Sequence, residues 1–222
     1  MNRRDESTAH NRPYVVLHAA VSVDGSTAGF EPDVGRFYEL AATWHEDVTL
    51  AGADTILAQE SELAEAEPLG PAPGGPILVI VDGRGRVSAW ESLRDAGYWS
   101  RVVAVHTART PPRDHGLPEI IAGIDRVDLA AVLLTLRERF DARVVRVDSG
   151  GALNGALLDA GLVDEVSLLI HPALAAADVR RSWHGGGPLS GRAMTLMSAQ
   201  ALPAGLVWLR LRMATDATAV PS

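Results

Sequence analysis

Apolar and polar positions along this chain follow two recurring patterns. Short continuous apolar runs predict buried strands, and apolar residues spaced three or four apart predict helices. The predicted strands are residues 14–23, 48–52, 77–81, 102–107, 120–122, 144–147 and 166–170, with 194–198 and 206–213 as closing antiparallel strands. The predicted helices are residues 33–46, a short turn from 53, 129–140 behind the capping Asp128, and 153–160 before Gly161. This order predicts an α/β fold with a mixed, mostly parallel sheet flanked by helices.

Two of the predicted strands run into a glycine turn that opens a helix. Val144–Val147 leads through Ser149-Gly150-Gly151 into the apolar pattern that starts at Leu153, and residues 48–52 end in Gly52 before a helical turn. Such a turn points free backbone N–H groups at an anion, and glycine lets a phosphate approach the main chain. Each turn alone is also compatible with an ordinary strand-to-helix loop. Their occurrence twice in one chain favours a dinucleotide site.

Length and hydropathy indicate a single folded domain. The chain has 222 residues and is 47% hydrophobic, which is enough for a full core. We expect one domain over residues 13–214, a disordered tail at 1–12 and a second tail at 215–222. The polar start and the lack of an apolar run of about 20 residues argue against a signal peptide or a membrane span. A cytoplasmic protein is therefore expected.

Charge and residue usage exclude several kinds of chemistry. The formal net charge of −8 argues against a nucleic-acid surface. All 20 basic residues are arginine, so Schiff-base catalysis and a P-loop lysine are excluded. The chain has no cysteine, which excludes disulfides, thiol nucleophiles and thiolate metal sites, and no metal is predicted.

The side chains with candidate chemistry each have a plainer interpretation. His18, inside an apolar run, is either a hydrogen-bonded core histidine or a catalyst. Asp24 begins an Asp-Gly turn, a common pairing in turns. Arg84 and Arg86 follow the strand at 77–81 and either bind an external phosphate or belong to a solvated turn.

The order of motifs resembles the pyrimidine reductases of riboflavin biosynthesis, over nearly the whole chain from about residue 14 to 213. The motifs that carry the resemblance are Ser22-Val23-Asp24-Gly25, Gly52-Ala53-Asp54-Thr55-Ile56-Leu57, Ile80-Val81-Asp82-Gly83, the stretch from Gly150 to Leu158, and Gly161-Leu162-Val163-Asp164-Glu165. The resemblance implies a dihydrofolate-reductase-like fold, NADPH as cofactor, a small-molecule substrate and a homodimer.

On the cofactor side, the resemblance places NADPH on the glycine turns. The residues it implies are Gly52, Thr55, Gly83, Arg84, Arg86, Thr107, Gly150, Gly151, Ala152 and Leu153. Within this set, Arg84 or Arg86 would bind the adenosine 2′-phosphate, because a guanidinium offers a fork of donors. Gly151→Val is expected to abolish NADPH binding and to leave the fold nearly intact.

On the substrate side, the chain departs from the family pattern. His18 stands where relatives carry lysine or asparagine, Thr43 where they carry arginine, and Asp148 where they carry glutamate. The implied substrate contacts are Ser22, Arg36, Glu60 and Asp148, and the implied catalytic residues are Asp24 first and His18 second. The departures remove positive charge, and Glu60 would repel a phosphate if it faced the same pocket. We therefore expect weak activity on the phosphorylated riboflavin intermediate.

Two functions are compatible with these observations. The first is an NADPH-dependent reductase that delivers hydride to a C=N or C=O carbon of a pyrimidine- or pterin-like substrate. The second is an NADP-binding structural or regulatory dimer without turnover. Steady NADPH oxidation with a pyrimidine substrate distinguishes them.

Overall fold

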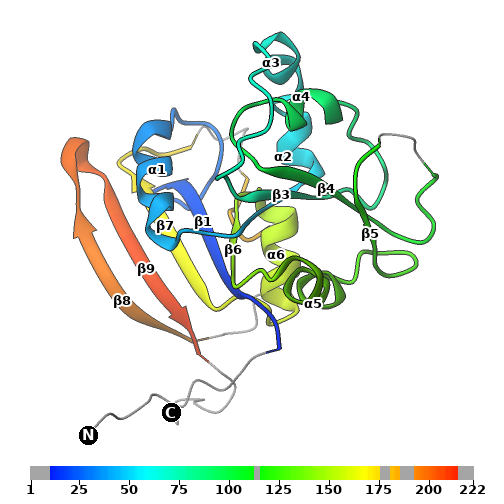
Figure 1. The fold of residues 1–222 in the computed structure, drawn as a ribbon. Helices are drawn as coiled ribbons and strands as arrows, with labels where there is room; N and C mark the ends of the chain where they lie inside the picture. The colour runs from blue at the N-terminus through cyan, green and yellow to red at the C-terminus, as the bar shows by residue number, and fades with distance from the viewer. Residues whose placement is uncertain (1–10, 113–115, 176–180, 186–192, 215–222) are drawn as a thin grey trace, which may run out of the picture.

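A single nine-stranded sheet forms the centre of the molecule, and its strand order is β5-β4-β3-β2-β6-β1-β7-β9-β8 (Figure 1). The computed structural model describes residues 11–112, 116–175, 181–185 and 193–214. The strands are β1 Tyr14–Ser22, β2 Val48–Gly52, β3 Ile77–Val81, β4 Arg101–His106, β5 Glu119–Ile121, β6 Val144–Val147, β7 Glu165–His171, β8 Met194–Ala201 and β9 Val207–Met213. Strands β1 to β7 pair in parallel, whereas β9 pairs antiparallel with both β7 and β8. The predicted mixed, mostly parallel sheet is confirmed.

Helices cover both faces of this sheet. They are α1 Val34–Ala41, α2 Ala53–Leu57, α3 Glu60–Glu65, α4 Trp90–Arg94, α5 Leu129–Phe140 and α6 Gly151–Asp159, with 3-10 turns η1 Ala42–Trp44 and η2 Pro203–Gly205. Buried side chains of α5 and α6 pack on one face. Those of α1, α2 and α4 pack on the other face, in two smaller clusters.

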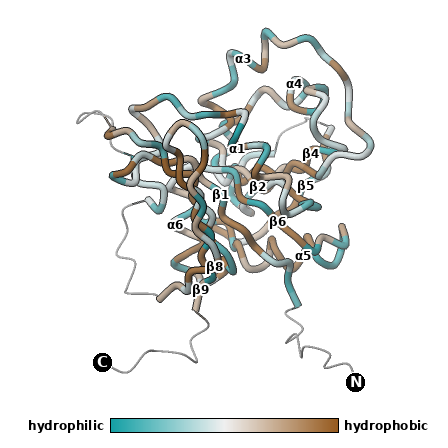
Figure 2. Tube along the Cα trace, turned by 90° about the vertical axis from the view of Figure 1, so that its left-hand side faces the viewer, coloured by the Kyte–Doolittle hydropathy of each residue, from teal (hydrophilic) through white to brown (hydrophobic). Residues whose placement is uncertain are grey.

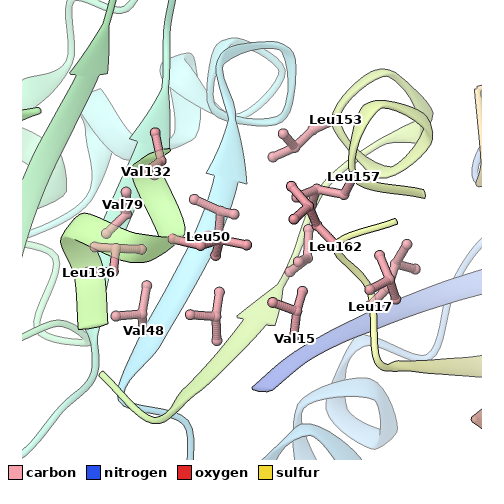
Figure 3. Close-up of a cluster of buried hydrophobic side chains, with 14 of the residues drawn as sticks. Val15, Leu17, Val48, Leu50, Val79, Val132, Leu136, Leu153, Leu157 and Leu162 are labelled. Carbon is pink, nitrogen blue, oxygen red and sulfur yellow. The ribbon is translucent and has the colours of Figure 1, made fainter. Parts of the chain in front are cut away.

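Strand residues alternate between the two faces, as the two-residue period of a strand requires. Figure 3 shows Val15, Leu17 and Leu50 pointing toward the layer that holds Leu136 and Leu157. Their neighbours point the opposite way. On β2, β6 and β1 these neighbours include Thr49, Arg146 and His18, all buried. The α1 side of the central strands is therefore unusually polar for a sheet core.

The predicted helix at 33–46 is shorter than expected. Asp33 caps α1, and its carboxylate accepts a hydrogen bond from the backbone N–H of Arg36. The chain then tightens into η1 and turns away at His45, which adopts a left-handed φ of 45°. Helix α4 was not predicted from the sequence. Gly161 ends the α6 region with a φ of 67°, as predicted.

The chain ends lie mostly outside the described residues. Arg12, which the prediction placed in the N-terminal tail, pairs with Asp164 at 2.7 Å. Figure 2 looks onto β8 and β9, where apolar residues are interspersed with polar ones. Within the described part of the chain, no helix is both long and apolar enough to cross a membrane.

Candidate active site

A cleft of about 1670 Å³ lies at the carboxyl ends of the parallel strands, the edge where open α/β sheets bind ligands. Its floor includes the ends of β2 and β3 and the residues that follow β4 and β6. Of the predicted site residues, those that line it are His18, Gly52, Thr55, Gly83, Arg84, Arg86, Thr107, Asp148, Gly150, Gly151, Ala152 and Leu153. The two glycine turns therefore meet in one cavity, because β2 and β6 are neighbours in the sheet.

Ser149 ties the two turns together. Its Oγ accepts a hydrogen bond from the Gly52 N–H at 3.1 Å and lies 3.3 Å from the Thr55 Oγ1. That Thr55 oxygen accepts in turn from the Gly150 N–H at 3.2 Å. A Cβ at Gly52, the last residue of β2, would lie only 2.9 Å from the Ser149 oxygen and would press on the hydroxyl that joins the two turns. These bonds fix the first turn of α6 against the start of α2.

The N-terminus of α6 opens into the cleft at Gly150. A Cβ built on Gly150, the N-cap residue, meets no other atom within 4 Å. A glycine N-cap brings no side chain, so within the part of the chain that the structure describes no capping side chain occupies the backbone N–H groups of the first turn, and they are available to a ligand. This combination of open space and free donors suits a phosphate group.

Gly151 lines the cleft and also packs against the segment at 182–185. A Cβ there would collide with the carbonyl oxygen of Ser182 and would lie 2.6 Å from the backbone nitrogen of Gly185. Gly155, one helical turn later, would meet the His184 carbonyl oxygen at 2.6 Å. The prediction that Gly151→Val leaves the fold nearly intact is therefore wrong. Gly151 lacks a side chain so that the 182–185 segment can pack on α6.

The turn after β3 places arginines at one end of the cleft. Arg86 pairs with Asp54 at 2.7 Å, whereas Arg84 forms no salt bridge within the described residues. Arg126, which the sequence analysis did not single out, lines the same cleft. Its neighbour Val127 would lie 3.1 Å from a Cβ on Gly83, so the two loops touch. Arg84 and Arg126 are thus the cations placed to bind an anion at this end.

The hydroxyl of Thr107, at the β3 end of the cleft, is hydrogen-bonded to a neighbouring side chain. Its Oγ1 lies 3.0 Å from the Thr110 Oγ1, and the Thr110 hydroxyl donates to the Gly83 carbonyl oxygen at 2.8 Å. The loop after β4 is in this way fastened to the loop after β3. Its predicted cofactor contact stays a prediction.

Hydrogen bonds occupy both ring nitrogens of His18. Trp208 donates to the Ser167 Oγ at 2.8 Å, Ser167 lies 2.9 Å from the His18 Nδ1, and Nε2 lies 3.1 Å from the Phe37 carbonyl oxygen. That carbonyl can only accept, so the proton sits on Nε2 and Nδ1 accepts from Ser167. Burial lowers the pKa of His18 to about 4. A neutral, fully bonded ring fixes α1 to the sheet, and this geometry does not support the predicted proton transfer.

Four predicted substrate-side residues lie outside the lining of the cleft. Ser22 donates to Asp24 Oδ1 at 2.6 Å, and that oxygen also accepts from the Ala175 N–H, so both residues hold the turn after β1. Arg36 pairs with Glu39 at 2.6 Å. Glu60 accepts from the Ser88 hydroxyl and from the Ser88 and Ala89 N–H groups before α4, and these bonds lower its pKa. In this conformation all four serve local structure.

Residues that the sequence analysis passed over complete the cleft. Tyr38 on α1 and Arg181 line it, and Arg146 lies buried beneath it. The Arg146 side chain is 5% exposed and pairs with Glu46 at 2.7 Å and with Asp148 at 3.1 Å. The sequence contained one indication of this ion-pair cluster. Arg146 interrupts a run of valines in a central strand, and a buried arginine requires carboxylate partners on its face of the sheet.

Comparison with known proteins identifies the family. The model of the RibD C-terminal domain matches residues 13–208. The chain belongs to this family. It is 32% identical over 191 residues to the 2,5-diamino-6-ribosylamino-4(3H)-pyrimidinone 5′-phosphate reductase of Methanothermobacter thermautotrophicus, covering 79% of this chain and 86% of the relative. The predicted resemblance to riboflavin-pathway reductases is confirmed.

Solved structures support the same fold. RibD of Acinetobacter baumannii superposes with a TM-score of 0.69 at 20% identity, covering 92% of this chain and 58% of that chain. Dihydrofolate reductase of Enterococcus faecalis, complexed with NADP(H), superposes with a TM-score of 0.54 at 8% identity, covering 91% and 97% of the two chains. The predicted dihydrofolate-reductase-like fold is confirmed.

Proposed function

We propose that this RibD-family chain is an NADPH-dependent reductase of a ribosylaminopyrimidine 5′-phosphate, the substrate class named for its 32% identical relative. The observation that carries the proposal is the open N-terminus of α6 at Gly150, inside a cleft of about 1670 Å³. A pyrophosphate fits there because free backbone donors and the positive end of the helix dipole point into open space. Gly52 and Thr55 fix the neighbouring turn, and Ala152 and Leu153 belong to the donor turn.

The protein contributes placement to this reaction. A bound nicotinamide supplies the hydride, and the acceptor is C1′ of the opened ribosylamino group. The rigid contacts between Ser149, Thr55 and Gly52 hold the two turns at one spacing, which is what alignment of two bound molecules requires. Because both His18 nitrogens are already bonded, we assign proton delivery to solvent.

Our expectation of weak activity on the phosphorylated intermediate rested partly on Glu60, and the structure removes that part of the argument. Glu60 is directed at Ser88 and Ala89, so it does not repel a phosphate in the cleft. Because the 32% identical relative is named as the reductase of this compound, we expect steady NADPH oxidation with 2,5-diamino-6-ribosylamino-4(3H)-pyrimidinone 5′-phosphate, with kcat/KM above about 10⁴ M⁻¹ s⁻¹. NADPH binding without oxidation would instead support a binding protein without turnover.

Arg84 is expected to set the preference for NADPH over NADH. Its guanidinium lines the cleft without a carboxylate partner among the described residues, whereas Arg86 is paired with Asp54. Arg84→Ala should reduce the ratio of NADPH to NADH affinity at least tenfold, since a charge-assisted phosphate contact contributes about 1.5–3 kcal/mol. Calorimetric titration of both cofactors measures the ratio. Arg86→Ala is the matched control; an equal loss in both variants would mean that Arg84 is not the specific contact.

We further propose that the chain is a cytoplasmic homodimer that uses the outer sheet strands. Met194 and Leu196 on β8 are 43% and 58% exposed, and Met194 and Leu196 pair with Met213 and Leu211 on β9. An exposed apolar edge of this kind favours burial against a second copy. Sedimentation equilibrium should give twice the mass of one chain, and Leu196→Glu should give a single-chain mass. A monomeric wild-type protein would overturn this proposal.

A further inference from the structure

Arg146 connects two carboxylates that come from distant parts of the chain. Its Nε donates to Glu46 Oε1 at 2.7 Å, and its Nη1 donates to Asp148 Oδ2 at 3.1 Å. Glu46 precedes β2, and Asp148 follows β6. The fixed fork of a guanidinium can bind both at once, which an ammonium group cannot do with the same geometry. The position of the Asp148 carboxylate in the cleft is therefore set by Arg146.

Tyr38 lies on the cleft side of the same unit. Tyr38 and Asp148 both line the cleft, and the Asp148 carboxylate acts on the Tyr38 hydroxyl. The Tyr38 ring centroid lies 6.0 Å from the Arg146 Cζ. Burial, followed by the charge of Asp148, raises the pKa of Tyr38 to about 12. The phenol therefore keeps its proton at neutral pH and remains a hydrogen-bond donor. Half of the residue is exposed, so a ligand in the cleft can reach it.

The charges of this unit indicate what kind of group it binds. The two carboxylates and one guanidinium leave a net negative charge beneath the cleft. A phosphate is repelled there, whereas the N–H groups of an amino-substituted heterocycle are attracted. The phenol hydroxyl beside the carboxylate adds a group that can donate or accept. A donor and an acceptor side by side match the edge of an aminopyrimidine.

We propose that Tyr38 and Asp148 together bind the amino-substituted pyrimidine ring of the substrate, with Tyr38 as a specificity-determining contact and Arg146 as the positioning residue that holds Asp148. This inference rests on the proposed reductase function. It places the heterocycle at the α1 end of the cleft, away from the arginines of the loop after β3.

The first test is Tyr38→Phe, which removes the hydroxyl and keeps the ring. Steady-state kinetics should show KM for the ribosylaminopyrimidine phosphate raised about tenfold, as expected for one lost hydrogen bond to a polar ligand. The value of kcat should stay within about twofold, and the Kd of NADPH should not change. The matched control is Tyr14→Phe, since the Tyr14 hydroxyl donates to Glu165 at 3.1 Å and Tyr14 does not line this cleft. The control should leave KM unchanged.

The second test separates positioning from stability. Arg146→Lys keeps the positive charge but loses the fork, so KM should rise about tenfold, as in Tyr38→Phe. A purely structural role for Arg146 would lower Tm and leave KM unchanged. Asp148→Asn removes the negative charge of the acceptor and leaves Arg146 in place. It should also raise KM, and it tests the proposal if the Arg146→Lys variant fails to fold.

The outcomes distinguish this inference from the proposed function. Turnover by the wild type with unchanged KM in both Tyr38→Phe and Asp148→Asn would overturn the inference and leave the reductase assignment in place. No turnover of the pyrimidine by the wild type would overturn the reductase assignment, and the inference with it.

Discussion

Replacing Gly150 with valine is expected to weaken NADPH binding at least a hundredfold and to leave the fold intact. Gly150 has φ −78° and ψ 176°, an extended conformation that valine adopts without strain. Its Cβ would enter open space in the cleft, where it meets no protein atom within 4 Å. The branched side chain would instead occupy the space next to the free N–H groups of α6. Calorimetric titration measures the loss, which corresponds to about 2.7 kcal/mol or more.

Gly151→Ala is the control for this prediction. Its added methyl group would collide with the backbone of the 182–185 segment rather than enter the cleft. We expect a lower Tm for this variant and an unchanged Tm for Gly150→Val. Tight NADPH binding by a folded Gly150→Val protein would show that the pyrophosphate does not approach α6 at this residue.

Replacing Arg146 with methionine is expected to lower the free energy of unfolding by about 3–5 kcal/mol, which is typical when one partner of a buried ion pair is removed. The change would leave Glu46 and Asp148, which are 11% and 24% exposed at their side chains, without their shared cation. Urea denaturation measures the difference. Adding Glu46→Gln should restore part of it, because it removes one of the two uncompensated charges. A loss below about 1 kcal/mol in the single variant would mean that solvent already screens both carboxylates.

Strands and turns that depend only on the local pattern of apolar residues and glycines were predictable from the sequence. The apolar runs at 144–147 and 48–52 predicted buried strands, and the glycines at their carboxyl ends predicted turns. The occurrence of two such turns favoured a dinucleotide site, and in the structure Ser149 joins the two turns. The boundary errors have local causes as well. The five-residue α4 has too few residues to show periodicity, and the backbone just before it is held by Glu60, which lies 28 positions before Ser88.

The roles that depend on distant partners were not predictable. Gly151 was predicted to face a phosphate, but the residues that require its small size are at 182–185. Arg86 and Arg84 look equivalent in the sequence, and only the position of Asp54 on α2 separates them. The role of Tyr38 was not predictable either, because Asp148, the carboxylate that acts on it, is distant in the sequence. Sequence spacing carries no information about such pairings.

The most direct test of the reductase assignment is transfer of deuterium from NADPH labelled at the nicotinamide C4. The wild-type protein is incubated with labelled cofactor and 2,5-diamino-6-ribosylamino-4(3H)-pyrimidinone 5′-phosphate, and the pyrimidine product is examined by mass spectrometry and NMR. We predict that the product carries one deuterium, bound at C1′ of an opened ribityl chain. Recovery of an unlabelled, unreduced pyrimidine from protein that binds NADPH would contradict the assignment.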